Sequence, residues 1–172
     1  MIRKMELIDI PRVAEINVFG WRVAYRGIVS DELLFTKRLV ATSIPRFQGG
    51  FFGSENNSEG YVFDDGIIKG FISVQPCADK DKPQAFELGA IYIEPLMKRK
   101  GIGTALMHFC EKLALERGHS EICLWVLEKN QDSRRFYEKM GYDVDGAHKY
   151  LEGLEATEVR YSKQLKKSAV NP

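Results

Sequence analysis

The chain has 172 residues, of which 44% are hydrophobic and 28% are charged, and its formal net charge is +1. Such a chain is long enough to bury a core, and its balanced charge gives no global argument for binding to nucleic acid or to a membrane surface. Its three cysteines and three histidines lack metal-ligand spacing, so we expect reduced thiols and no metal site. No apolar signal region opens the sequence, and no apolar run approaches the about 20 residues that span a bilayer, so we expect a cytoplasmic protein.

The first half of the chain is predicted to contain two helices and a hairpin. In chain order we expect a helix from Asp9 to Gly27, a helix from Asp31 to about Thr42, a mobile Gly-, Ser- and Asn-rich loop over residues 49–59, and strands at 60–63 and 67–74 joined by Asp64-Asp65-Gly66. In the first helix, Asp9 is the expected N-cap and Pro11 lies in the first turn.

The second half alternates strands and helices. In chain order we expect a strand over Phe86–Ile93, a helix from Ile102 that ends at Gly118, a nearly continuous apolar strand over Glu121–Leu127, a short helix over Arg134–Met140, and strands at about Tyr142–Tyr150 and Glu155–Leu165. This order is that of an α+β protein.

The most informative segment is Lys98-Arg99-Lys100-Gly101-Ile102-Gly103-Thr104, which follows a predicted strand and opens a predicted helix. Its two glycines let the backbone approach a ligand closely and turn sharply into the helix. The first N–H groups of a helix are free and carry a partial positive charge, and together these features favour phosphate binding. The alternative is a surface turn with solvated charges.

Two common phosphate-binding motifs are excluded. A dinucleotide-binding fingerprint needs a third glycine where this chain has Leu106, and a P-loop needs a Gly-Lys-Ser or Gly-Lys-Thr string that does not occur. The expected ligand therefore carries phosphate but is bound by neither motif.

Two motifs make the chain similar to the GCN5-related N-acetyltransferase (GNAT) superfamily over nearly its whole length. The family's glycine motif is Arg or Gln, two residues, Gly, one residue, then Gly or Ala; Lys98 in the first position departs from it. Asn130-Gln131-Asp132-Ser133-Arg134-Arg135-Phe136-Tyr137-Glu138-Lys139-Met140-Gly141-Tyr142 resembles the family's Asn-x-x-Ser/Ala-x-x-Phe-Tyr-x-x-x-Gly-Phe/Tyr segment. The departure matters little if the loop acts mainly through its backbone.

The resemblance implies a single-domain GNAT fold over residues 1–165. This fold is a mixed, mostly antiparallel sheet of about six or seven strands, flanked by about four helices and splayed between the fourth and fifth strands. Residues 166–172 are expected to form a frayed tail. Acetyl-CoA is the implied acetyl donor.

The resemblance also implies which residues bind acetyl-CoA. The pyrophosphate is expected on the N–H groups of the glycine loop, and the pantetheine arm along the open edge of the fourth strand, as an added strand. The implied residues are Ile91, Tyr92 and Ile93 on the strand, Lys98, Arg99, Lys100, Gly101, Ile102, Gly103 and Thr104 in the loop, and Asn130, Ser133 and Tyr137 in the second motif.

Acetyl transfer by direct attack of an amine on a thioester needs a base, an oxyanion donor and an acid for the departing thiolate. Tyr137 stands at the family's general-acid position; alternatively, its ring only packs against the donor. Glu87 is the candidate base; the alternatives are a solvent-facing or ion-paired glutamate and proton transfer through water. A strand N–H near Ile91 is the expected oxyanion donor.

The acceptor is expected to be a primary amine of a small molecule or a peptide. Trp21 and Tyr25 are candidate lining residues, although core packing suits Trp21 equally well, and Trp125 is expected in the core. Two other functions stay open. A GNAT-type toxin that acetylates aminoacyl-tRNA is disfavoured by the net charge of +1, and a non-catalytic acyl-CoA sensor is disfavoured by the presence of Glu87 and Tyr137. A homodimer is compatible with the sequence, whereas nucleic-acid and membrane partners are not expected.

Overall fold

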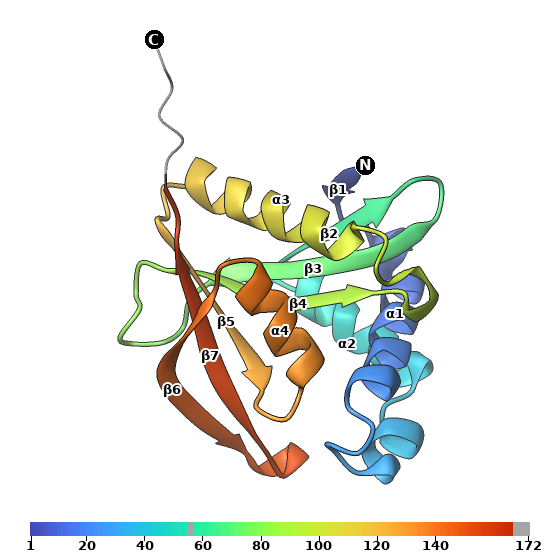
Figure 1. Cartoon of the computed structure of the whole chain (residues 1–172). Helices are drawn as coiled ribbons and strands as arrows, with labels where there is room; N and C mark the ends of the chain where they lie inside the picture. The colour runs from blue at the N-terminus through green and yellow to red at the C-terminus, as the bar shows by residue number, and fades with distance from the viewer. Residues whose placement is uncertain (55–56, 167–172) are drawn as a thin grey trace.

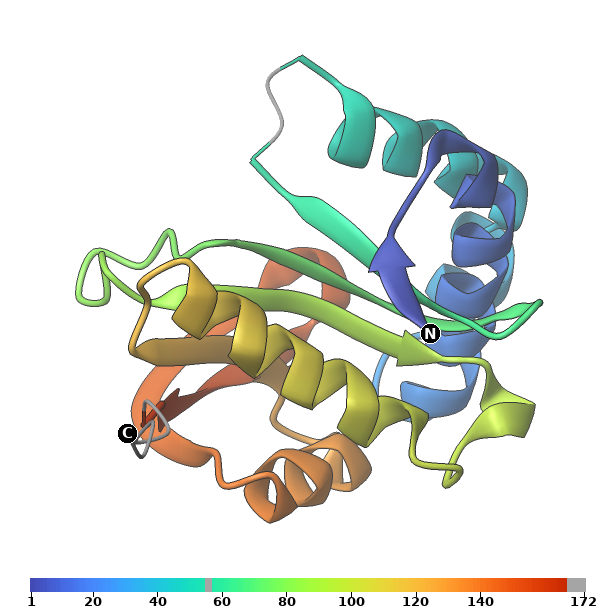
Figure 2. The same ribbon diagram turned by 90° about the horizontal axis from the view of Figure 1, so that it is seen from above.

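The computed structural model describes residues 1–54 and 57–166, which form a seven-stranded sheet with helices on both faces (Figures 1 and 2). The strands are β1 (Ile2–Lys4), β2 (Glu59–Asp64), β3 (Ile68–Pro76), β4 (Phe86–Ile93), β5 (Glu121–Leu127), β6 (Asp143–Leu151) and β7 (Ala156–Gln164). The helices are α1 (Ile10–Ala24), α2 (Val40–Phe52), α3 (Ile102–Glu116) and α4 (Gln131–Lys139). This arrangement confirms the predicted α+β class.

The sheet order is β1-β2-β3-β4-β5-β7-β6, and only β4 and β5 run parallel. These two strands pair at their first residues alone, Phe86 opposite Ile122 and Glu87 opposite Cys123. Farther along, β4 remains paired with β3, and β5 remains paired with β7. The sheet is therefore splayed between β4 and β5, as predicted, and Figure 1 shows α4 lying over the gap.

Two helices cover each face of the sheet (Figure 2). One apolar cluster joins α3 and Tyr137 of α4 to the sheet, with Phe86, Leu106 and Ile122 among its buried members. A second cluster joins α1 to Val62 and Phe71 on the opposite face, where α2 also packs. The hydrophobic faces of the helices explain why they lie against the sheet.

The second predicted helix is wrong in its position. Residues 33–37 form a single π-helical turn, and α2 runs over Val40–Phe52, through Pro45 and into the segment predicted as a mobile loop. Ile44, Phe47 and Phe51 lie on one face of α2 and pack against the α1 cluster. Their burial outweighs the weak helix propensity of proline and glycine. Residues 55 and 56 of the predicted loop lie outside the described residues.

The N-terminal end also differs from the prediction. Asp9 precedes α1, but its side chain does not cap that helix. Instead, the buried carboxylate accepts hydrogen bonds from Arg3 at 2.7 and 2.9 Å and from the Glu6 N–H at 2.8 Å. Arg3 lies on β1, a three-residue strand too short for its periodicity to be recognised in the sequence.

The C-terminal end is described only in part. Of the segment predicted as a frayed tail, residues 167–172 lie outside the described residues. Among the described residues, none of the helices is both long and apolar enough to cross a membrane.

Candidate active site

The glycine loop forms the N-terminal end of α3. Gly101 precedes the helix with φ +81°, a left-handed conformation that glycine adopts without steric cost. The Ala105 N–H donates to the Gly101 carbonyl at 2.9 Å. The N–H groups of Ile102, Gly103 and Thr104 precede this first helical hydrogen bond and have no acceptor within the helix. Three donors at the positive end of a helix fit a pyrophosphate group.

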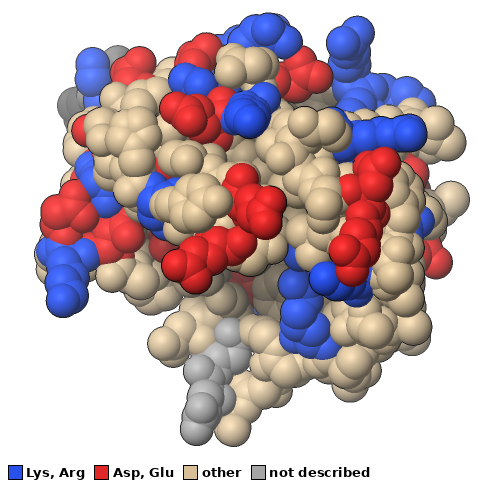
Figure 3. Space-filling model, turned by 90° about the horizontal axis from the view of Figure 1, so that it is seen from below, with Lys and Arg blue, Asp and Glu red and all other residues tan. Residues whose placement is uncertain are grey.

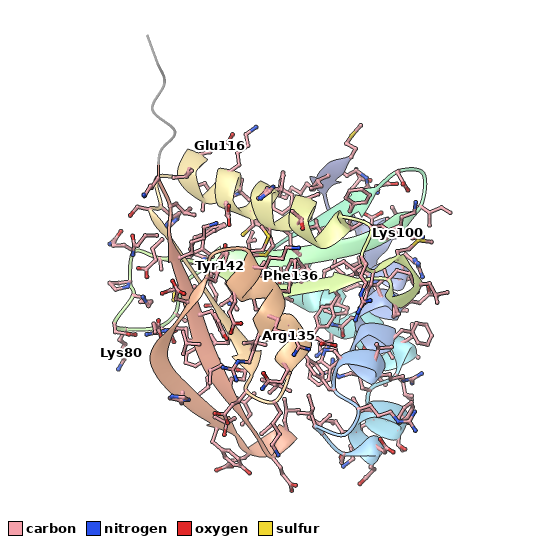
Figure 4. All side chains as sticks on the ribbon, in the orientation of Figure 1. Lys80, Lys100, Glu116, Arg135, Phe136 and Tyr142 are labelled. Atoms are coloured by element: carbon pink, nitrogen blue, oxygen red, sulfur yellow. The ribbon has the colours of Figure 1, made fainter. Side chains whose placement is uncertain are left out.

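Three exposed basic side chains stand directly before these donors. Among the described residues, Lys98, Arg99 and Lys100 form no ion pair, so their charges are available to an anion. Arg99 also has φ +62°, which is uncommon for a residue with a side chain. Figure 4 shows Lys100 at the entrance to α3 and Phe136 on α4.

Gly103 packs against α4. A Cβ at this position would lie 3.3 Å from Phe136 Cζ and 3.5 Å from Ile93 Cδ1. The glycine therefore brings the donor end of α3 close to both α4 and the end of β4. The two sequence motifs, 26 residues apart at Thr104 and Asn130, meet at one place in the fold.

The edge of β4 that faces β5 is unpaired beyond Glu87, along the stretch that includes Ile91, Tyr92 and Ile93. The register against β3 shifts at Gly89, where a β-bulge inserts one residue. The bulge reverses the alternation of side chains. Leu88 and Ile91 consequently both pack on the α3 face, whereas Tyr92 packs with the α1 cluster on the other face.

Asn130 and Ser133 are engaged with each other at the start of α4. The Asn130 Oδ1 accepts the Ser133 N–H at 3.2 Å, and its Nδ2 donates to the Ser133 Oγ at 2.9 Å. Asn130 is buried, with 5% of its surface exposed. It is thus an N-cap that fixes the beginning of α4, and one Nδ2 hydrogen is left to donate elsewhere.

Tyr137 is buried on α4, close to the gap in the sheet. Burial, and then the nearby Tyr25, raise the pKa of Tyr137 above its ordinary value. Tyr25 directly follows α1, and its hydroxyl lies 3.1 Å from the hydroxyl of Tyr92 on β4. Burial also raises the pKa of Tyr25 and of Tyr92. All three phenols are therefore neutral at physiological pH and can act as hydrogen-bond donors.

Glu87 lies at the closed end of the gap, as the last β4 residue paired with β5. Its side chain is half-buried on the face opposite α3, and its carboxylate lies within 4.8 Å of the sulfurs of Cys77 and Cys123. Burial raises the pKa of Glu87, while hydrogen bonds from Gln75 and from the Ala78 N–H oppose this shift. A carboxylate with a raised pKa is a stronger base than an exposed one.

The gap is bounded on the α1 side by Trp21 and Tyr25, whose rings meet edge to face with centroids 4.7 Å apart. Both are partly buried against an apolar cluster that includes Leu127 of β5. Trp125 is half-buried rather than a member of the main core, and its Nε1 donates to Asp79 at 3.1 Å. Trp21 and Tyr25 thus lie together beside the gap, and the expectation that Trp125 is a core residue is wrong.

Sequence reasoning missed two side chains of this region. Tyr92 was predicted only for its backbone; the signal that could have indicated its side chain is Gly89, because a glycine inside a strand often marks a bulge that reverses the alternation. Arg38, whose guanidinium lies over Trp21, belongs to no motif. The i, i+4 spacing of Trp21 and Tyr25 was the available signal for an aromatic face on α1.

Comparison with known proteins identifies the family. A model described as the acetyltransferase (GNAT) family matches residues 30–142. A spermidine N1-acetyltransferase of Thermoplasma acidophilum is 28% identical over an alignment of 165 residues that covers 88% of this chain and 94% of the relative. A probable N-acetyltransferase of Mycobacterium tuberculosis is 29% identical over an alignment of 169 residues that covers 93% of this chain and 91% of the relative.

The fold has solved counterparts. The crystal structure of the PaiA N-acetyltransferase of Thermoplasma acidophilum in complex with coenzyme A has a TM-score of 0.71 at 24% identity, and the match covers 95% of this chain and 98% of that one. Since the family model spans most of the chain and the curated relatives match over nearly its whole length, the protein belongs to the GNAT family and is an N-acetyltransferase.

Proposed function

We propose that the protein transfers the acetyl group of acetyl-CoA to a primary amine of a small molecule or a peptide, by direct attack in a ternary complex. The unpaired edge of β4 carries this proposal, because it opens between the free N–H groups of α3 and the buried phenol of Tyr137. An extended arm can add to such an edge as a strand while its phosphates remain at the helix.

The residues present fit the donor. Ile91, Tyr92 and Ile93 would hold the pantetheine arm through their backbone, and the loop from Lys98 to Thr104 would hold the pyrophosphate. The remaining Nδ2 hydrogen of Asn130 would donate to the arm, and Ser133 would keep Asn130 oriented. Acetyl-CoA, the donor used by the family, would supply a thioester carbonyl for attack by the amine.

Two side chains would move the protons. Glu87, at the closed end of the gap, would take a proton from the attacking amine, directly or through one water. Tyr137 would give its phenolic proton to the departing thiolate, and an N–H near Ile91 would donate to the oxyanion. Trp21 and Tyr25 would line the approach of the acceptor.

The names of two relatives support an amine acceptor. The Thermoplasma relative is named for spermidine. A peptidyl-lysine N-acetyltransferase of Escherichia coli is 29% identical over 89 residues, 51% of this chain. Both names describe amines of aliphatic chains, one in a small molecule and one in a peptide. The three free cysteines suit a reducing compartment such as the cytosol as the place of action.

The charge distribution favours this function over acetylation of aminoacyl-tRNA. Figure 3 shows basic and acidic side chains interspersed on the face seen from below, without the broad basic surface that favours nucleic acid. The combination of Glu87 and Tyr137 favours an enzyme over an acyl-CoA sensor.

The proposed function is tested by thiol release from acetyl-CoA with a panel of polyamines, amino acids, peptides and aminoacyl-tRNA, with product masses as confirmation. Acetylation of an amine of the first three kinds is expected. Turnover confined to aminoacyl-tRNA, with binding that weakens steeply in salt, would instead identify the toxin. Tight acetyl-CoA binding without turnover on any acceptor would identify the sensor.

A further inference from the structure

Arg38 lies beside the aromatic wall of the gap. It follows the π-helical turn over Leu33–Lys37, and its Cζ lies 3.3 Å from the centroid of the Trp21 ring. Its Nη1 donates to the Oδ1 of Asn17 at 3.1 Å. Asn17, on α1, is itself buried, with 4% of its surface exposed. The guanidinium is therefore held in one place by stacking and by a buried hydrogen bond.

The positive charge of Arg38 has no negative partner within the described ranges 1–54 and 57–166. Its Nε is buried without a hydrogen-bond partner, and the charge that acts on it most is that of Arg46, which has the same sign. Burial and then Arg46 lower the pKa of Arg38 to about 10, so the group remains charged at neutral pH. An unpaired, partly buried charge is unfavourable.

Arg160 provides a comparison within the same protein, because it is a buried arginine whose charge is paired. Its exposed fraction is 4%, and it forms ion pairs with Asp79, Asp81 and Asp145. Three carboxylates surround one buried guanidinium there, whereas Arg38 has an amide and an aromatic ring. The missing anion at Arg38 is thus not a general property of this fold's arginines.

The location of Arg38 relates it to the acceptor rather than to the phosphates of the donor. Its guanidinium lies over Trp21, the Trp21 ring meets that of Tyr25, and the Tyr25 hydroxyl lies 3.1 Å from that of Tyr92 on β4. The glycine loop that fits the pyrophosphate follows the same end of β4 but opens α3 on the opposite face of the sheet from Tyr92 and α1. An anion at Arg38 would consequently belong to a molecule lying on the Trp21 and Tyr25 side of the gap.

We propose that Arg38 binds a carboxylate of the acceptor, so that the preferred substrates are amines that carry a carboxylate, such as amino acids. Nη1 already donates one hydrogen to Asn17 and Nε is buried, which leaves Nη2 and the second Nη1 hydrogen as the pair of donors for a carboxylate, and stacking on Trp21 fixes their orientation. This inference rests on the proposed acetyl transfer, whose acceptor class it specifies.

The test uses pairs of amines that differ only in the carboxylate: lysine with cadaverine, ornithine with putrescine, and leucine with isopentylamine. For the full chain, kcat/KM is expected to be at least tenfold higher for the carboxylate-bearing member of each pair. Arg38→Gln should remove most of that preference, lowering kcat/KM for the amino acids far more than for the matching amines. Arg38→Lys should keep part of it, because the charge remains but the pair of donors is lost.

Arg22→Gln is the matched control. Arg22 also stacks on an aromatic ring of this region, at 5.2 Å from Phe35, and donates to the Leu34 carbonyl, but it has no place in the proposed site. The Arg22→Gln variant should retain the preference for amino acids over the matching amines. The proposal would be overturned if the full chain acetylated cadaverine, putrescine or spermidine as well as or better than the amino acids. It would also be overturned if Arg38→Gln lowered kcat/KM equally for both members of each pair.

A second measurement separates this proposal from the proposed function. If no amine is acetylated, acetyl transfer itself is wrong, and calorimetry of lysine and cadaverine with the coenzyme A complex decides the role of Arg38. Tighter binding of lysine that is lost in Arg38→Gln would still support a carboxylate site, and equal binding would refute it.

Discussion

At the scale of single residues, burial determines the proton chemistry of Tyr137. Burial raises the pKa of Tyr137, so the phenol keeps its proton at neutral pH but is a weaker acid than an exposed tyrosine. As the general acid it would therefore first donate a hydrogen bond to the sulfur, and the proton would follow as the C–S bond breaks and negative charge develops. We expect Tyr137→Phe to lower kcat by about 10²-fold or more, the range typical of general acid catalysis, with little change in the KM for acetyl-CoA. Steady-state kinetics with chemistry as the rate-limiting step checks this. Tyr142→Phe, which changes the neighbouring ring, is the control, and a drop of less than about threefold in Tyr137→Phe would leave a packing role only.

Glu87 should determine the pH dependence of the rate. As a base it must be ionised, and burial raises its pKa, so activity should rise with pH through a value above that of an exposed glutamate. Glu87→Gln should lower the rate at neutral pH, and the rate should partly recover at high pH, where more of the free amine is already neutral. Cofactor affinity should be nearly unchanged.

The pH–rate profiles of the two proteins provide this test. Glu128→Gln, a change at an exposed position just after β5, should reproduce the profile of the unmodified chain. A Glu87→Gln variant with that same full profile would assign proton removal to water and backbone carbonyls.

At the scale of the elements, the N-terminal end of α3 is expected to dominate donor binding. Gly103→Asp would place a negative charge at free N–H groups and a Cβ 3.3 Å from Phe136 Cζ. Calorimetry should show a large loss of acetyl-CoA affinity, with circular dichroism confirming that the fold is kept. Gly49→Asp in α2, where a Cβ would meet nothing within 4 Å, is the matched control and should bind normally. Unchanged acetyl-CoA affinity in Gly103→Asp would show that this loop does not bind the phosphates of the donor.

The elements that could be predicted from the sequence are those with strong local patterns. Phe86–Ile93 and Glu121–Leu127 have the predicted bounds, because continuous apolar runs between turn residues indicate buried strands. The course of α2 could not be predicted, since Pro45 and the two following glycines are typical of a break. The tertiary contacts of Ile44, Phe47 and Phe51 with the α1 cluster, which local patterns do not reveal, favour the helix there.

The same reasoning applies to the candidate site. The loop at 98–104 and the segment at 130–142 are contiguous motifs, so their residues could be named from the sequence. Arg38 and the side chain of Tyr92 lie beside Trp21 and Tyr25 only through tertiary packing, and no spacing along the chain encodes this proximity. Residues that only tertiary packing brings together cannot be predicted from patterns in the sequence.

At the scale of the whole molecule, the ion pair of Glu59 with Arg117 connects β2 to the end of α3, with Nη1 to Oε1 at 2.6 Å. Arg117 lowers the pKa of Glu59 from 4.5 to about 2. A carboxylate whose pKa is lower in the folded state stabilises the fold when the pH is above its pKa in the unfolded chain. This contribution is lost as the pH falls through its pKa in the folded state. After allowance for solvent screening, we expect the pair to contribute about 1 kcal/mol.

Urea denaturation of the unmodified chain and of Glu59→Gln between pH 7 and pH 2 measures this contribution. The difference in unfolding free energy should be largest at pH 7 and should shrink between pH 4.5 and about 2, the window set by the two pKa values. A difference that stays constant with pH would mean that packing, and not charge, accounts for the effect of Glu59.

The apolar cluster that joins Trp21 and Tyr25 to Leu127 and Ala156 has a consequence for the width of the gap. The two halves of the sheet meet at the closed end of the gap through two residue pairs. The cluster adds a second connection, because it joins the end of α1, which packs on the β2–β4 half, to the ends of β5 and β7. Widening the gap would expose that cluster to water, which is unfavourable. The width of the gap is therefore set by the fold in advance, so a bulky acceptor would have to fit the gap rather than widen it.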